Sequence, residues 1–392
     1  MSQSIENLIS ELHRKYPTEE YVMRALDRKL RLRAGAKPYS AQSLLAVEQR
    51  LRAFLSKRIR GAFAVSELRP LTGGLSKEQF SFVLTREVDG QQQSERLVLR
   101  TQPIQSAAET HRLREYQIMG ALQGIVPLPE PRWVDAEAEE FENPALICSF
   151  VHGVSKPDEG PTAVQTSYGR YREKLGPQFA EMLARTHAYE CDRTALSAFH
   201  MPKVGTDEGV LTHINWWARV WEEDAVEPEP VVTMAEQWLR TNALPIDRAS
   251  LLHGDYRNTN FLFSLETGDI TAVLDWELAS IGDRHLDLAY VLQPLFIEKM
   301  SDGTELVCGL MPADEFLREY QQRSGLSVDP ERLRYYEVFM RWRNVVTTIG
   351  GGGRCAVAQN THHDILFAWF VSAIRVPIMA ALRESLERVL DH

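Results

Sequence analysis

The chain has 392 residues, of which 44% are hydrophobic and 25% are charged, and its formal net charge is −10 at pH 7. This composition is that of an ordinary globular protein. The excess of acid argues against nucleic acid or an anionic membrane as the main partner, because both repel a negative surface.

Cysteine usage and the N-terminal residues indicate where the protein works. The four cysteines are far apart and form no paired spacing: Cys148, Cys191, Cys308 and Cys355. Neither a disulfide framework nor a zinc site is expected, so a reduced cytoplasmic setting is predicted. The N-terminus is polar and carries acid early, unlike a secretory signal. No uninterrupted apolar run reaches the roughly 18–20 residues of a membrane span.

Residues 1–60 predict a helical N-terminal extension. Val22, Leu26 and Leu30 recur at every fourth position, which is typical of one helix face. Ser40 is a candidate N-cap for a further helix. The pattern does not decide whether this extension packs on the following sheet or on a second subunit, so a homodimer stays open.

Residues 61–153 predict a small sheet and one helix. Strands are expected at Phe63–Leu71, Gln79–Arg86 and Arg96–Arg100, with a hairpin turn at Asp89–Gly90. Gly73, Gly74 and Ser76 lie in the loop between the first two strands, where glycines would let the backbone approach an anion. A plain hairpin turn is the alternative. A helix at Ala107–Gln123 and a strand at Ala145–Gly153 follow.

Residues 154–392 predict a mostly helical region. Helices are expected at Pro177–Cys191, Val231–Thr241, Pro312–Ser324, Pro330–Ile349 and Asn360–Leu390. The run Gly350–Gly353 is interpreted as a flexible break between the last two, either a simple connector or the rim of a substrate pocket.

The stretch from Leu251 to Phe263 carries the chemistry. Apolar residues at both ends anchor a polar loop that exposes Asp255 and Asn260, and a strand further on delivers Asp275 at its end. A carboxylate, an amide and a second carboxylate are suited to a hydroxyl nucleophile and a phosphate-bound Mg²⁺ ion.

The combined motif resembles a known family. It consists of His253-Gly254-Asp255 with Asn260, Asp275-Trp276-Glu277, and Gly282-Asp283 with Asp287. This combination is similar to the aminoglycoside phosphotransferase family, and in detail to the phosphotransferase domain fused to some acyl-CoA dehydrogenases. The resemblance implies an α+β fold of the protein-kinase type. A small antiparallel-sheet N-lobe (61–153) would adjoin a helical C-lobe (154–392) with the catalytic loop and acceptor site, after the N-terminal extension.

The resemblance also implies roles for the site residues. Asp255 would orient the acceptor hydroxyl and accept its proton, and Arg257 would lie near the transferred phosphate unless it is a solvated loop residue. Asn260 and Asp275 would bind Mg²⁺, and Glu277 would either join them or hold the loop.

Binding of ATP is implied for residues of the sheet lobe. Arg100 would grip the phosphates in place of the lysine that is usual in the family, and Glu115 would hold it. The loop of Gly73, Gly74 and Ser76 would close over the phosphates. Ser149 and Val151 would meet the adenine at the hinge between the lobes.

The predicted function is transfer of the γ-phosphoryl group of ATP, with Mg²⁺, to a hydroxyl of a small molecule. A hydroxyacyl-CoA kinase activity within this fold and a non-catalytic nucleotide-binding module are the alternatives. The motif does not identify the acceptor or decide between ATP and GTP.

Overall fold

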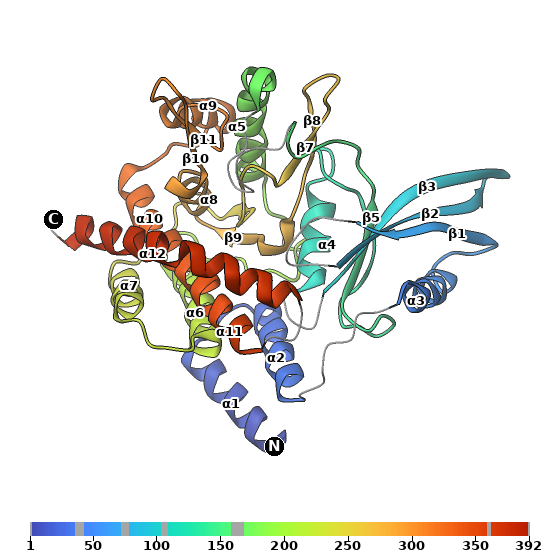
Figure 1. The fold of residues 1–392 in the computed structure, drawn as a ribbon, viewed down its shortest axis with the longest axis horizontal. Coiled ribbons are helices and arrows are strands. Elements are labelled where there is room, and N and C mark those ends of the chain that lie inside the picture. Colours follow the sequence, from blue (N-terminus) through green and yellow to red (C-terminus); the bar gives the residue numbers. More distant parts are fainter. Residues whose placement is uncertain are drawn as a thin grey trace.

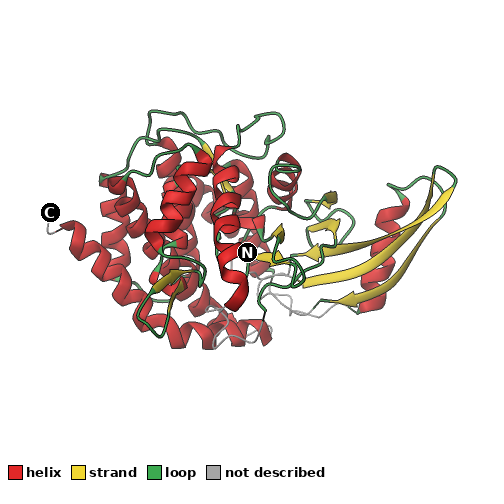
Figure 2. Cartoon of the chain, turned by 90° about the horizontal axis from the view of Figure 1, so that it is seen from above, coloured by secondary structure: helices red, strands yellow, loops and turns green. Residues whose placement is uncertain are grey.

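The computed structural model describes residues 2–35, 43–71, 78–102, 109–157, 168–358 and 362–390. A lobe built on one antiparallel sheet stands beside a larger, mostly helical lobe (Figures 1 and 2). This α+β arrangement confirms the predicted fold class.

Five strands form the N-lobe sheet, in the order β1-β2-β3-β5-β4. Their bounds are β1 Phe63–Pro70, β2 Glu78–Val88, β3 Gln91–Thr101, β4 Pro131–Asp135 and β5 Ala145–Ser149. The predicted hairpin turn at Asp89 and Gly90 is confirmed, and both residues have positive φ. The sequence pattern missed β4 because this strand begins with a proline. The strand lies at the sheet edge, where a missing N–H costs no ladder hydrogen bond.

The three helices of the N-terminal extension divide between the lobes. Helix α3 (Leu44–Ser56) buries Leu51 against the sheet, in one core cluster with Phe82. Its N-cap is Ser43, whose hydroxyl accepts a hydrogen bond from the amide of Ala46 at 3.2 Å. The expected cap, Ser40, lies outside the described residues.

Helices α1 (Ser2–Lys15) and α2 (Glu20–Ala34) lie beside α6 (Glu208–Asp224) of the C-lobe (Figure 1). Buried ion pairs join α2 to α6: Lys29 is 2.5 Å from Glu223 and 3.2 Å from Asp224, and Arg219 is 2.7 Å from Asp27. Removing one member would leave a buried charge without its partner, which typically costs about 3–5 kcal/mol. The extension therefore packs on both lobes of its own chain.

The remaining elements complete the N-lobe and build the C-lobe. The other helices are α4 Arg112–Ala121, α5 Arg172–Ala188, α7 Pro230–Thr241, α8 His285–Val291, α9 Ala313–Ser324, α10 Pro330–Val345, α11 Gly351–Ala358 and α12 His362–Leu390. The short strand pairs are β6 Ser250–Leu252 with β9 Ser280–Gly282, β7 Phe261–Phe263 with β8 Ile270–Val273, and β10 Ile297–Lys299 with β11 Glu305–Val307. A single large core cluster spans the C-lobe helices, α1 and α2.

The glycine run Gly350–Gly353 is not the expected break. A π-helical turn (Val346–Gly350) and α11 continue the helix through it. A Cβ atom on Gly352 would lie 2.7 Å from Val371 of α12, and one on Gly350 would lie 3.4 Å from the Trp221 ring. The glycines therefore allow α11 to pack closely on its neighbours.

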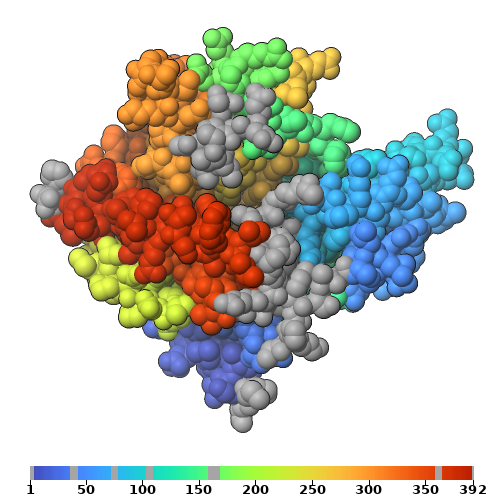
Figure 3. Space-filling model, viewed as in Figure 1, coloured from blue at the N-terminus to red at the C-terminus, as the bar shows by residue number. Residues whose placement is uncertain are grey.

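Helix α12 crosses one face of the molecule (Figure 3). Its segment Asp364–Leu390 is long and apolar enough to cross a membrane by length and composition. An 18-residue stretch of it has a mean hydropathy of 2.0, and 17% of that stretch is buried in the structure. The sequence expectation of no such segment relied on uninterrupted apolar runs, and Arg375 interrupts this one. In the structure α12 packs against α10 and α11.

Candidate active site

Two short antiparallel strand pairs bring the predicted site residues together. Strand β6 leads into the loop that carries Asp255, and β7, which pairs with β8, leads out of it. The amide of Leu274 donates to the carbonyl of Asn260 at 2.8 Å, so Asp275 follows directly beside Asn260. The predicted meeting of Asp255, Asn260 and Asp275 is thus present in the structure.

The carboxylate of Asp255 is held by three donors. Asn260 Nδ2 donates to Oδ2 at 2.8 Å, Arg257 Nε donates to Oδ1 at 3.2 Å, and the Tyr290 hydroxyl also donates to Oδ1. Asn260 Nδ2 donates in addition to the Asp255 carbonyl at 2.9 Å. The side-chain nitrogen of Asn260 faces Asp255, so the side-chain oxygen of Asn260 points away from Asp255 and could bind a cation.

Arg257 lies at the rim of this group. Its Nη1 donates to Thr259 Oγ1 at 2.9 Å, and about a quarter of its side chain is exposed. Burial opposes its charge, but the nearby Asp255 carboxylate raises the pKa of Arg257 above its ordinary value. The guanidinium is therefore a fixed positive charge beside the Asp255 carboxylate.

A buried carboxylate fixes the backbone of the loop. Asp287 accepts hydrogen bonds from the amides of His253 at 2.6 Å and Gly254 at 2.8 Å, and contacts His187 Nε2 at 3.1 Å. Burial works against the ionised form, but these contacts lower the pKa of Asp287 overall. Asp287 therefore holds the backbone of the loop in place.

His253 is part of the scaffold of this loop. Its Nδ1 accepts from the amide of Asp255 at 3.2 Å, and its Nε2 lies 2.8 Å from the Leu274 carbonyl. Burial lowers the pKa of His253, so the ring is neutral and Nε2 carries the proton that it donates. With both nitrogens occupied, His253 orients Asp255 and links the loop to β8.

Only glycine fits at position 254. Its φ is +80°, and a Cβ atom there would lie 2.3 Å from the carbonyl oxygen of Leu278. Its own carbonyl accepts from Arg343 Nη2 at 2.6 Å. Arg343, from α10, and Tyr290, from α8, were missed in the sequence analysis because no local pattern connects these helices to the loop.

Asp275 adopts a left-handed backbone conformation, with φ of +58°. Residues other than glycine rarely adopt this conformation, and those that do are concentrated at functional sites. Its carboxylate is 43% exposed and accepts from Arg100 Nη2 at 2.8 Å. The Asp275 side chain is therefore partly accessible to a ligand.

Arg100 joins the two lobes through its forked guanidinium. Its Nη1 donates to Glu115 at 2.6 Å, which confirms the predicted pair, and Nη2 reaches Asp275. Burial opposes this charge, but the carboxylates of Glu115, Asp275 and Glu277 raise the pKa of Arg100. Glu115 has a second partner in Arg112, which is fully buried. Arg100 is thus a permanent cation at the interlobe site.

Some predicted contacts fall elsewhere. Gly73, Gly74 and Ser76 lie outside the described residues. The amide of Ser149 donates to the Glu130 carbonyl at 2.9 Å, and its hydroxyl accepts from the Glu130 amide at 2.8 Å. These bonds attach β5 to the turn before β4, so the Ser149 amide is not free for an adenine. Val151 is half-buried just beyond β5 and stays a predicted nucleotide contact.

The protein oxygens of this site suit Mg²⁺ only if phosphate oxygens of the nucleotide supply the remaining ligands. Among the described residues, no group of three His, Cys, Asp or Glu side chains could hold a metal. Mg²⁺ commonly takes one or two protein oxygens together with phosphate oxygens. The outward oxygen of Asn260 and the exposed carboxylate of Asp275 fit this pattern, while a role for Glu277 stays a prediction.

Comparison with known proteins agrees with this geometry. The model of the phosphotransferase enzyme family matches residues 67–336. The chain therefore belongs to the phosphotransferase enzyme family.

Two curated relatives are acyl-CoA dehydrogenase family members, as the sequence resemblance implied. Acyl-CoA dehydrogenase family member 10 of Mus musculus is 26% identical over 223 residues, 54% of this chain and 20% of that protein. Acyl-CoA dehydrogenase family member 11 of Gallus gallus is 28% identical over 191 residues, 47% of this chain and 23% of that protein. The chain thus matches less than a quarter of the length of either relative.

Solved structures share the fold. A Ralstonia eutropha protein provisionally described as an aminoglycoside phosphotransferase superposes with a TM-score of 0.61 and 21% identity, covering 87% of this chain and 98% of that one. A GDP complex of a mutant aminoglycoside 2′-phosphotransferase-IIIa superposes with a TM-score of 0.54 and 19% identity, covering 87% of this chain and 100% of that one. Plasmodium vivax ethanolamine kinase superposes with a TM-score of 0.52 and 12% identity, covering 93% of this chain and 94% of that one. These likenesses establish the kinase-like fold.

Proposed function

We propose that this phosphotransferase moves the γ-phosphoryl group of ATP to a hydroxyl of a small molecule, with Mg²⁺. The observation that carries the proposal is the convergence of Asp255, Asn260 and Asp275 between the lobes, with Arg100 facing them from β3. Carboxylate, amide and guanidinium are the groups that a phosphoryl transfer needs for the acceptor, the metal and the phosphates.

Asp255 is proposed to receive the acceptor hydroxyl and accept its proton. Its three donors fix the direction of the carboxylate, so the acceptor oxygen can be held in line with the phosphorus at little entropic cost. Arg257 is placed to offset negative charge as the phosphoryl group moves. Asn260 and Asp275 would hold Mg²⁺, which when bound neutralises charge on the phosphate oxygens.

Arg100 is proposed to release Asp275 when nucleotide binds. In the structure it occupies one oxygen of Asp275, at 2.8 Å. A phosphate is a natural second partner for its planar fork, and the pair with Glu115 at 2.6 Å would keep the side chain in place. Support for a nucleotide comes from a related phosphotransferase crystallised with AMP-PNP and hygromycin B.

The acceptor is proposed to be a hydroxylated metabolite. The similarity to acyl-CoA dehydrogenase family members makes hydroxyacyl thioesters one class to test. Aminoglycosides and amino alcohols are the other classes, because related folds carry those names. A cytoplasmic location and a homodimer also stay predictions.

A panel assay tests the function. Purified protein is incubated with Mg-ATP and each acceptor class, and phosphorylated product is detected by mass spectrometry. Asp255→Asn should abolish product, whereas Asp269→Asn, a 53%-exposed aspartate in the β7–β8 turn, should not. Nucleotide binding without product on any acceptor would favour the non-catalytic alternative. Equal product from the Asp255→Asn variant would remove Asp255 from the proposed role.

A further inference from the structure

The segment between α1 and α2 reaches the helix that carries Glu115. We infer that Glu19, in this segment, is a positioning residue for the nucleotide site: through Arg114 it fixes α4, and with it the Glu115–Arg100 pair. This inference rests on the proposed function, because it assigns a task to the N-terminal extension within nucleotide binding.

The contact between Glu19 and Arg114 is buried and bidentate. Arg114 Nη1 donates to Glu19 Oε2 at 2.6 Å and Nη2 donates to Oε1 at 3.0 Å. The side chains are 4% and 3% exposed. Burial opposes the charge of Glu19, but the adjacent Arg114 keeps the pKa of Glu19 below its ordinary value. Paired guanidinium and carboxylate groups in this geometry fix distance and direction together.

Arg114 also contacts the segment that follows Asp275. Its Nη2 donates to the carbonyl of Ala279 at 3.1 Å, and its guanidinium lies 4.1 Å from the centre of the Phe199 ring. One side chain of α4 is therefore bound at once to the N-terminal extension, to the 197–200 loop and to the chain leaving the metal-binding aspartate.

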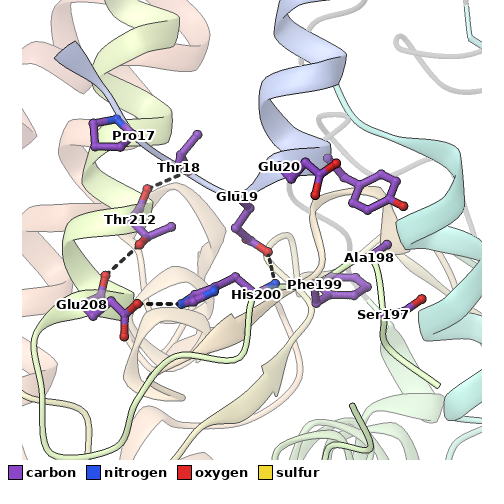
Figure 4. A pocket seen from close by; sticks show the side chains of 11 residues that line it. Pro17, Thr18, Glu19, Glu20, Ser197, Ala198, Phe199, His200, Glu208 and Thr212 are labelled. Atoms are coloured by element: carbon purple, nitrogen blue, oxygen red, sulfur yellow. Dashed lines mark hydrogen bonds and ion pairs between the residues drawn. The ribbon is translucent and has the colours of Figure 1, made fainter. Parts of the chain in front are cut away.

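The same segment is bound to the C-lobe. Glu19 Oε2 accepts from the amide of His200 at 2.9 Å, and the Thr18 hydroxyl donates to the Thr212 carbonyl at 3.0 Å (Figure 4). Asn215 Nδ2 donates to the Pro17 carbonyl at 2.8 Å. Residues 17–19 thus lie between α6 and α4 and are attached to both.

The position of α4 matters because Arg114 and Glu115 are neighbours in one helix. Successive helical side chains point about 100° apart, so Arg114 can face the C-lobe while Glu115 faces Arg100 at 2.6 Å. A rotation or shift of α4 would move both residues together. Loss of the Glu19 contact should therefore loosen the grip of Arg100 on the nucleotide phosphates and leave Asp255, which is held by Tyr290 of α8, unaffected.

A pocket lies beside this contact, and its lining includes a control residue for substitution of Glu19. Its volume is about 370 Å³, and it is lined by residues 17–21 and 197–200 together with Glu208 and Thr212 (Figure 4). Glu19 lies at its inner wall, whereas Glu20, next in sequence, is 64% exposed and pairs with Arg24 on the surface. Glu20→Gln is therefore a matched control for Glu19→Gln.

The test measures Mg-AMP-PNP binding by calorimetry and, once an acceptor is identified, KM for ATP and for the acceptor. Glu19→Gln should weaken nucleotide binding by about ten-fold, which corresponds to about 1.4 kcal/mol, with the acceptor KM unchanged. Glu20→Gln should match the parent. A purely structural role for Glu19 would lower the melting temperature without this selective effect.

Each remaining outcome decides between the two proposals. Parent protein that fails to bind Mg-AMP-PNP overturns the proposed function and the inference together. Parent that binds, with Glu19→Gln equal to it, overturns the positioning role alone. If Glu19→Gln does not fold, Arg114→Lys keeps the buried charge but not the fork, and the same selective weakening is then expected; unchanged binding in that variant overturns the role.

Discussion

Replacement of Arg100 by methionine separates nucleotide binding from folding. Arg100 is buried between Glu115 and Asp275, and loss of a buried cation ordinarily destabilises a protein by about 3–5 kcal/mol. Here Glu115 keeps a second cation, Arg112, and the Asp275 carboxylate is 43% exposed to solvent. The stability loss should therefore be smaller, about 2 kcal/mol, near the value of one charge-assisted hydrogen bond.

The effect on nucleotide should be much larger. One charge-assisted contact to a phosphate contributes roughly 1.5–3 kcal/mol, so the Kd for Mg-AMP-PNP should rise by roughly 10–100-fold. Urea unfolding measures the loss of stability, and titration calorimetry measures the Kd for Mg-AMP-PNP. Arg96→Met is the control, since Arg96 is on the same strand and pairs with the exposed Glu67. Unchanged nucleotide affinity in Arg100→Met would refute the phosphate role, and loss of the fold would refute the compensation by Arg112.

Three further changes test other parts of the site. Asp255→Ala should lower turnover by roughly 10²–10⁴-fold with nucleotide binding kept; equal turnover would exclude the base role. Asp287→Asn should destabilise the protein by about 3 kcal/mol in urea unfolding. Both oxygens of Asp287 accept hydrogen bonds from the backbone amides of His253 and Gly254, and the asparagine side chain has only one oxygen. A loss of stability below about 1 kcal/mol would contradict this. Burial lowers the pKa of His213 from 6.5 to about 4, so the unfolded chain binds the extra proton and stability falls as the pH drops from 6.5 to 4, by about 3 kcal/mol for this group. His213→Asn should remove that part of the slope, and an unchanged slope would show that His213 does not titrate in this range.

Four strands of the N-lobe sheet, several helices and the three central site residues could be predicted because their patterns are local. The period-two run of β2, the turn at Asp89 and Gly90, and the apolar ends of the Asp255 loop each fit within a short window. The pair of Arg100 and Glu115 followed from resemblance, and the structure confirms it at 2.6 Å.

The contacts that hold the loop could not be predicted in this way. Tyr290 and Arg343 reach Asp255 and Gly254 from helices far along the chain, and only tertiary packing brings them there. The glycine run at 350–353 was interpreted as a break because glycine is a poor helix former. Close packing outweighs that propensity at Gly352, where a Cβ atom would lie only 2.7 Å from Val371.

The most direct test of the account is whether nucleotide binding depends on Mg²⁺ through Asp275. Titration calorimetry with AMP-PNP should give clear binding to the parent protein with Mg²⁺ and weaker binding without it. In Asp275→Ala the difference between the two conditions should disappear. Parent affinity that is the same with and without Mg²⁺, or an Asp275→Ala variant that retains the full dependence, would contradict the proposed metal and phosphate site.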